Sequence, residues 1–188
     1  MVRIAVFLAL SFCAAVHGAT PPAPRVMGKA WILGDFTSGQ VLLAEKADER
    51  IEPASLTKLM TAYLVFTAIR DKKFTLEQQV PVSARAWRAA GSRMFLDPKK
   101  PVTVDQLIKG MEVQSGNDAC IALAEAVAGS EESFVQLMNR EAARLGMAGT
   151  HFMNPTGLPD AQHYSTARDL YTLAVALIRE FPDEYLRY

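Results

Sequence analysis

One segment of the sequence, from Pro53 to Ile69, is apolar on nearly every face of the helix that it predicts. Its apolar positions are Leu56, Leu59, Met60, Ala62, Leu64, Val65, Phe66 and Ile69. Pro53 suits a helix entry because the N–H that proline lacks has no partner in a first turn. A helix that is hydrophobic nearly all round is buried, so the other elements must be arranged around this one.

The rest of the chain predicts a β-hairpin followed by more helices. Turn-forming residues at 35–39 separate two strand-like runs, which predicts a hairpin over residues 30–44. Ser130 is placed to cap a helix, and so is Thr166, which has capping-box spacing to Asp169. The predicted helices cover residues 103–113, 119–128, 131–145 and 165–180, whereas 74–101 is mixed and 150–164 is a loop.

The N-terminus is typical of a secretory signal peptide. Arg3 precedes an apolar run, Ile4–Val16, and small residues follow at Gly18 and Ala19. The run is short for a transmembrane helix, which disfavours the alternative of a retained membrane anchor. We therefore expect residues 1–19 to be a signal peptide and residues 20–29 to be a Pro-rich mature N-terminus.

Composition limits the remaining possibilities. Half of the 188 residues are hydrophobic, which is enough for a domain with its own core. The formal net charge is zero and no basic stripe occurs, so nucleic acid is not an expected partner. After cleavage only Cys120 would remain, which excludes an internal disulfide, and its apolar surroundings predict a packing role. His151 and His163 lack the spacing of a metal site and are interpreted as loop hydrogen-bonding residues.

The central helix also carries candidate chemistry, in Ala54-Ser55-Leu56-Thr57-Lys58. Side chains three residues apart lie on one helix face, so Ser55 and Lys58 are predicted to be adjacent. A serine hydroxyl becomes a good nucleophile when a neighbouring base takes its proton. Burial near a helix N-terminus lowers the pKa of a lysine and lets it serve as that base. The spacing alone also fits a capping serine beside a solvent-reaching lysine.

A second candidate element is Ser115-Gly116-Asn117, in a predicted loop between two helices. A second hydroxyl beside a serine–lysine pair can relay a proton to a leaving amine. An asparagine side chain offers both a donor and an acceptor to a peptide-like substrate. The alternative is turn chemistry, in which Asn117 or Asp118 caps the next helix. Ser-x-x-Lys followed by such a triplet forms two of the three elements that mark β-lactamases and penicillin-binding proteins.

With these motifs, the chain resembles the low-molecular-mass penicillin-binding proteins of the D-alanyl-D-alanine carboxypeptidase family, from about residue 28 to the end. The stretches that carry the resemblance are residues 52–62, residues 114–119, Met138-Asn139 and residues 163–169. The resemblance implies an α/β (α+β) fold of the penicillin-binding-protein and β-lactamase type. In that fold an antiparallel sheet flanked by helices pairs with an all-helical subdomain. Residues 30–188 would then be a partial catalytic domain.

The resemblance also implies a mechanism and a location. Ser55 would attack the penultimate D-alanine of a peptidoglycan stem peptide ending in D-Ala-D-Ala, and Lys58 would accept its proton. Ser115 would pass that proton to the departing D-alanine, while Asn117 would hold the substrate amide. β-Lactam antibiotics would acylate Ser55 and remain, and the Ser55 N–H would serve as an oxyanion donor. No metal or organic cofactor is expected, and the protein would be periplasmic or in the cell envelope.

The chain departs from the family pattern at its third motif. No Lys-Thr-Gly triplet occurs, so we expect that this chain is truncated before that motif and before the remaining sheet strands. Membrane attachment would depend on a C-terminal segment absent here. One alternative is a non-catalytic penicillin-binding-protein-like scaffold. A class A β-lactamase fits less well, because Gly116 replaces the expected Asp and residues 150–164 contain no Glu.

Overall fold

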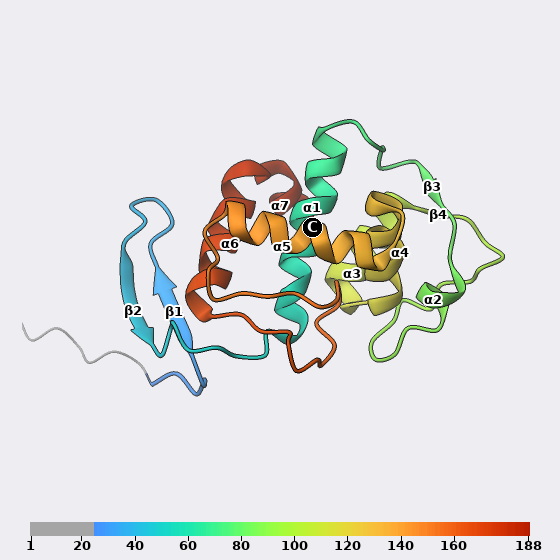
Figure 1. Cartoon of the computed structure of the whole chain (residues 1–188). Helices are drawn as coiled ribbons and strands as arrows, with labels where there is room; N and C mark the ends of the chain where they lie inside the picture. Colours follow the sequence, from blue (N-terminus) through green and yellow to red (C-terminus); the bar gives the residue numbers. More distant parts are fainter. Residues whose placement is uncertain (1–24) are drawn as a thin grey trace, which may run out of the picture.

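The computed structural model describes residues 25–188, so the predicted signal peptide lies outside the described residues. Helix α1 (Lys58–Arg70) runs through the middle of the molecule, as Figure 1 shows. Met60 and Val65 on this helix have no exposed surface, and Tyr63 is almost fully buried. The predicted central helix is therefore confirmed.

Four helices pack directly against α1. They are α3 (Val104–Gln114), α4 (Asn117–Ala128), α5 (Glu131–Arg144) and α6 (Ala167–Glu180). Their ends follow local chemistry: Thr103 and Gln106 form a capping box on α3, and the hydroxyl of Ser130 accepts the Ser133 N–H at 3.1 Å. The short helix α7 (Pro182–Arg187) follows α6.

An aromatic cluster joins the C-terminal helices to α1. The rings of Tyr63 and Phe181 meet edge to face with centroids 5.2 Å apart, and Phe66 lies 5.7 Å from Phe181. Tyr188 stacks on Phe66 at 5.9 Å. Rings in these arrangements add to the free energy gained from burial alone, so the cluster fixes residues 181–188 against the central helix.

The predicted hairpin is confirmed as strands β1 (Trp31–Gly34) and β2 (Val41–Glu45), which pair antiparallel with Trp31 opposite Glu45. A lone hairpin is marginally stable in water. Here α6 supports it, because Tyr171 packs directly on Gly34. Figure 1 shows the hairpin at one end of the molecule, beside α6.

Residues 74–101 contain order that the sequence interpretation left as mixed. Strand β3 (Gln79–Val80) pairs antiparallel with β4 (Val102–Thr103), and α2 (Ala84–Trp87) lies between them in the chain. The buried Asp118 carboxylate accepts the N–H groups of Met94 and Leu96 at 2.9 and 3.0 Å. These long-range bonds, rather than local propensity, hold this segment in place.

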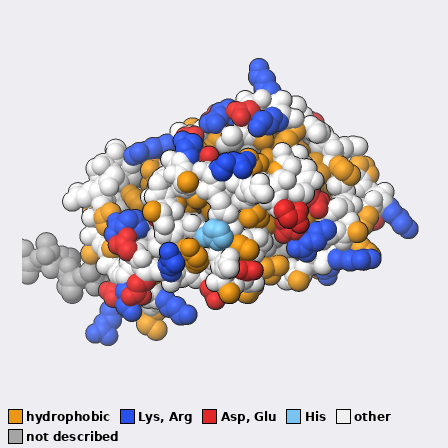
Figure 2. Space-filling view, viewed as in Figure 1, with side chains coloured by type: hydrophobic (Ala, Val, Ile, Leu, Met, Phe, Trp, Pro, Cys, Tyr) orange, Lys and Arg blue, Asp and Glu red, His pale blue; other side chains and the backbone are white. Residues whose placement is uncertain are grey.

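Acidic and basic side chains are interspersed on the face drawn in Figure 2. Arg168 pairs with Asp48 through two hydrogen bonds of 2.6 and 2.9 Å, which is a structural ion pair at the start of α6. Across residues 25–188, we find no helix with the length and apolar character needed to cross a membrane.

Candidate active site

The turn that carries Ser55 has an unusual backbone. Ala54 has a φ of 47°, a left-handed value that non-glycine residues rarely adopt. The chain then forms a 3₁₀ turn, η1 (Ala54–Thr57), before α1 begins at Lys58. The sequence predicted a continuous helix from Pro53, so its first turn is corrected to 3₁₀ geometry. With about three residues per turn, 3₁₀ geometry stacks positions three apart, and Lys58 Nζ lies 3.4 Å from Ser55 Oγ.

Lys58 is buried, with 5% of its surface exposed, and its ammonium is held by two oxygen acceptors. Nζ donates to Asn117 Oδ1 at 2.8 Å and to the Thr156 carbonyl at 2.7 Å. Burial lowers the pKa of Lys58, whereas negative charge at Cys120 and Glu112 would raise it. Burial also raises the pKa of the Cys120 thiol to about 12, so Cys120 is neutral near pH 7. Burial raises the pKa of the Glu112 carboxyl as well, and the ionised form of Glu112 favours charged Lys58.

Ser115 approaches the same hydroxyl from the other side of the site. It ends α3 in a left-handed conformation with a φ of 52°. Its Oγ donates to Ser55 Oγ at 2.9 Å. The Gly116 N–H donates to the Gly110 carbonyl at 3.0 Å, which closes the turn between α3 and α4. The structure therefore brings Ser55, Lys58 and Ser115 together.

Asn117 is the first residue of α4 and not a loop residue, and only 5% of its surface is exposed. Its Oδ1 accepts from Lys58, while Nδ2 donates to the Ala90 carbonyl at 2.8 Å. Its backbone N–H donates to the Ser92 carbonyl at 2.8 Å. One lone pair and one N–H of this side-chain amide have no hydrogen-bond partner among the described residues.

The loop at residues 150–164 also belongs to the site, which the sequence interpretation missed. Asn154 Oδ1 accepts the backbone N–H groups of Thr156, Gly157 and Leu158 at 2.7–3.1 Å. This turn directs the Thr156 carbonyl to Lys58. The neighbouring Pro155 carbonyl accepts the Thr61 hydroxyl at 2.8 Å. The Asn-Pro-Thr-Gly signal was present in the sequence, but only the fold shows that it meets α1.

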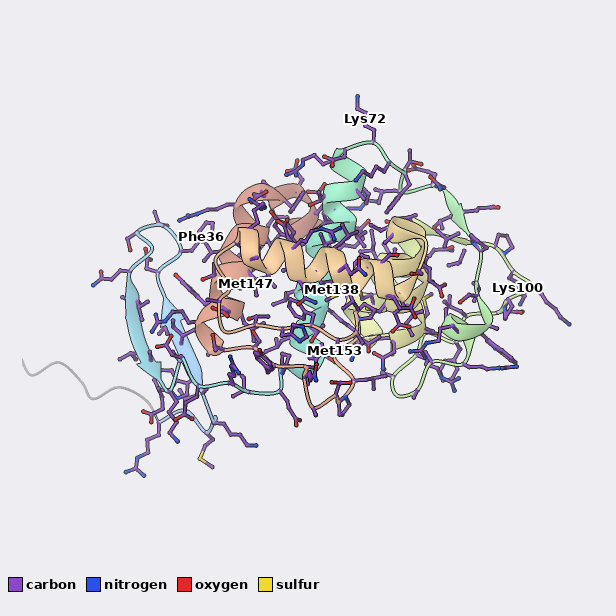
Figure 3. The ribbon with its side chains drawn as sticks, in the orientation of Figure 1. Phe36, Lys72, Lys100, Met138, Met147 and Met153 are labelled. Atoms are coloured by element: carbon purple, nitrogen blue, oxygen red, sulfur yellow. The ribbon has the colours of Figure 1, made fainter. Side chains whose placement is uncertain are left out.

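Two further contacts join this loop to the turn that carries Ser55. His163 Nε2 lies 2.8 Å from Thr57 Oγ1. Gly157, with a φ of 83°, packs so closely on the Ala54 carbonyl that a Cβ atom there would collide with it. In Figure 3 the labelled Met153 lies on this loop, below α5 and beside the lower end of α1.

Ser55, Lys58 and Ser115 line a cleft of about 510 Å³ between η1, α1 and the end of α3. Its other lining residues are Pro53, Ala54, Leu56, Leu59, Met111 and Glu112. Among the described residues 25–188, no cluster of His, Cys, Asp and Glu side chains is arranged to hold a metal ion. The cleft thus offers an exposed hydroxyl, a buried amine and a second hydroxyl, which together suit acyl transfer to serine.

Fold and site together define a class: a penicillin-binding-protein fold with a serine–lysine pair in its cleft. The sequence model of the D-alanyl-D-alanine carboxypeptidases matches residues 17–188, and the chain belongs to this family. The D-alanyl-D-alanine carboxypeptidase DacC of Escherichia coli K12 is 48% identical over 172 residues, which cover 88% of this chain and 43% of DacC. DacA of the same strain is 41% identical over 203 residues, which cover 100% of this chain and 50% of DacA.

Solved structures agree with this assignment. The D-alanyl-D-alanine carboxypeptidase DacD from Francisella tularensis has a TM-score of 0.85 and 40% identity, covering 88% of this chain and 40% of that one. Penicillin binding protein 5 from Haemophilus influenzae has a TM-score of 0.84 and 40% identity, and the match covers 89% of this chain and 49% of that one. The predicted fold class and family are confirmed. The chain spans about half the length of the relatives that it matches, or somewhat less.

Proposed function

We propose that this chain is the acylating part of a serine-type D-alanyl-D-alanine carboxypeptidase that removes the terminal D-alanine from peptidoglycan stem peptides. The observation that carries the proposal is the convergence of Lys58 Nζ and Ser115 Oγ on Ser55 Oγ, at 3.4 and 2.9 Å. Membership in the family supplies the substrate class. The non-catalytic scaffold alternative gains no support from this arrangement, because all three reacting groups remain in one cleft.

In the proposed reaction, neutral Lys58 takes the proton of Ser55 as Oγ attacks the carbonyl of the penultimate D-alanine. The peptide C–N bond then breaks, and the departing D-alanine amine receives the proton from Lys58 through the Ser115 hydroxyl. Water later hydrolyses the ester on Ser55 and restores the hydroxyl. Asn117 orients the substrate amide with the lone pair and N–H that it has free. The lowered pKa of Lys58, which burial causes, raises the fraction of lysine that can accept a proton.

A β-lactam would follow the first half of this path. Ser55 would open the lactam ring, and the leaving nitrogen would stay tethered, so the acyl-enzyme would persist. The family match favours this outcome over β-lactamase turnover. We place the reaction in the periplasm or cell envelope, since the substrate lies there and residues 1–19 have the pattern of a signal peptide.

The test is D-alanine release from a peptide ending in D-Ala-D-Ala, by the protein expressed from its complete reading frame. We expect release by the wild type and loss of about a thousandfold or more in Ser55→Ala and Lys58→Ala, because each removes a reacting group. Circular dichroism would confirm that both variants are folded. Equal release by Ser55→Ala and wild type would contradict the nucleophile assignment, and rapid turnover of benzylpenicillin would instead indicate a β-lactamase.

A further inference from the structure

We propose that His163 is a positioning residue of this site, whose neutral imidazole ties the turn carrying Ser55 and Lys58 to the loop that holds the Lys58 amine. The proposal rests on the proposed function, because it concerns how the acylating groups are held. His163 touches none of the reacting atoms. It acts through Thr57, which lies between Ser55 and Lys58 in the chain.

Both ring nitrogens of His163 are engaged, and their partners fix the tautomer. The Met153 backbone N–H can only donate, and it lies 3.0 Å from Nδ1, so Nδ1 carries the lone pair. Nε2 therefore carries the hydrogen and donates to Thr57 Oγ1 at 2.8 Å. His163 is 4% exposed and Thr57 is fully buried. The edge-to-face contact with Phe152, at 5.7 Å, further limits rotation of the imidazole ring.

The loop that His163 anchors contacts three positions on one face of the catalytic segment. His163 binds the Thr57 hydroxyl, the Thr156 carbonyl accepts from Lys58, and the Pro155 carbonyl accepts from Thr61. Of these three, only the His163 bond joins side chain to side chain across the two segments. Loss of that bond would let the loop shift and would change the direction in which Lys58 is held. A displacement of about 1 Å in a reacting group can cost on the order of a hundredfold in rate.

Protonation would break this arrangement, because a charged imidazole carries N–H groups at both nitrogens. The Nδ1–H would then face the Met153 N–H, and the loop would lose an anchoring bond. Two titratable groups act on His163: Asp160 favours the charged ring, and His151 opposes it. Burial outweighs both and lowers the pKa of His163, which keeps the ring neutral near pH 7.

The test uses Thr57→Val and Thr57→Ser in the protein from the complete reading frame. Valine keeps the shape of threonine and removes the acceptor, whereas serine keeps the acceptor. The measurement is acylation by a fluorescent penicillin, separated into noncovalent affinity and the first-order acylation rate. We expect Thr57→Val to lower the acylation rate on the order of tenfold with little change in affinity, and Thr57→Ser to restore most of it.

Two further variants make the test specific. His163→Phe should lower the acylation rate as Thr57→Val does, and the double variant should be no slower than the slower single, because both remove one bond. Thr172→Val removes a hydroxyl that bonds only the Arg168 carbonyl within α6, outside the catalytic turn and residues 150–164, and should acylate at the wild-type rate. If His163→Phe does not fold, the comparison of Thr57→Val with Thr57→Ser still tests the positioning role.

A folded Thr57→Val protein that acylates as fast as Thr172→Val would overturn the positioning role. Additive losses in the double variant would also overturn it. Failure of the proposed function gives a different result, because the wild type would then remain unlabelled or Ser55→Ala would still be labelled.

Discussion

Lys58 is subject to two opposing requirements in this site. It must lose its proton to serve as a base, yet it donates to Asn117 and Thr156 while it is charged. Burial disfavours the charge, and the two acceptors limit the cost of retaining it. Nearby residues set the balance, and among them Glu112 lines the same cleft and raises the pKa of Lys58 when it is ionised.

Glu112→Gln should therefore move the acidic limb of the acylation profile to lower pH. The carboxylate raises the pKa of Lys58, so its removal leaves a larger fraction of neutral lysine at a given acidic pH. The measurement is the acylation rate against pH for wild type and variant. Glu45→Gln is the control, because Glu45 is exposed at the end of β2 and does not line the cleft that holds Ser55. A limb that stays in place, or moves to higher pH, would contradict this role.

Gly157→Ala should slow acylation by about tenfold through a collision with the Ala54 carbonyl, next to Ser55. Gly129→Ala is a matched control, since the two glycines have φ values of 83° and 81° but Gly129 has open space around it. Both variants should lose about 1 kcal/mol or more of stability through backbone strain, and Gly157→Ala should lose more because of the collision. Acylation rates of the folded variants separate the two effects, and equal rates would show that the Gly157 contact is unimportant.

The elements divide into those set by local chemistry and those set by distant contacts. Local chemistry sets α5, which begins at the Ser130 cap. It also sets the β1–β2 hairpin, whose strands flank a turn-rich segment. The pairing of β3 with β4 depends on strands of two residues each, too short to leave a pattern in the sequence.

The same division applies to the candidate site. Ser55, Lys58, Ser115 and Asn117 were predicted from motifs, and the structure places them together. The 3₁₀ turn at Ala54 and the contribution of residues 150–164 were not predicted. Each depends on contacts between segments far apart in the chain, such as Gly157 with Ala54 and His163 with Thr57. Local periodicity carries no information about such contacts.

The variant Gly34→Ala tests whether α6 supports the β1–β2 hairpin. Tyr171 of α6 fills the space in which a Cβ atom at Gly34 would lie. The added methyl should force Tyr171 aside and cost about 1–3 kcal/mol in the free energy of unfolding, measured by chemical denaturation. Gly28→Ala is the control, because its Cβ would meet only an ordinary contact, with Trp31 at 3.5 Å. Equal stability of the two variants would show that α6 does not support the hairpin through this contact.

On the scale of the whole molecule, the packing around α1 makes stability depend on groups that stay uncharged. His163 is the clearest case, since burial lowers its pKa below the ordinary value of 6.5. Below that pH the unfolded chain binds the proton before the folded one does. Stability is therefore lost as pH falls from about 6.5 through the lower pKa of the folded state.

The unfolding midpoint of the wild type should thus fall more steeply between pH 7 and pH 5 than that of His163→Phe. Carboxylates that titrate in the same range contribute equally to both proteins, so the difference between the two slopes isolates His163. Thermal unfolding followed by circular dichroism measures the unfolding midpoint of each protein at each pH. Parallel slopes would indicate that the His163 ring has the same proton affinity in the folded and unfolded states.

The most direct test of the whole account is the mass of the protein from the complete reading frame after incubation with benzylpenicillin. We predict an increase equal to one intact penicillin, located by digestion on the peptide that contains Ser55, and no increase in Ser55→Ala. An adduct on another residue, or an unchanged mass in folded wild-type protein, would contradict the assignment of Ser55 as the acylated nucleophile.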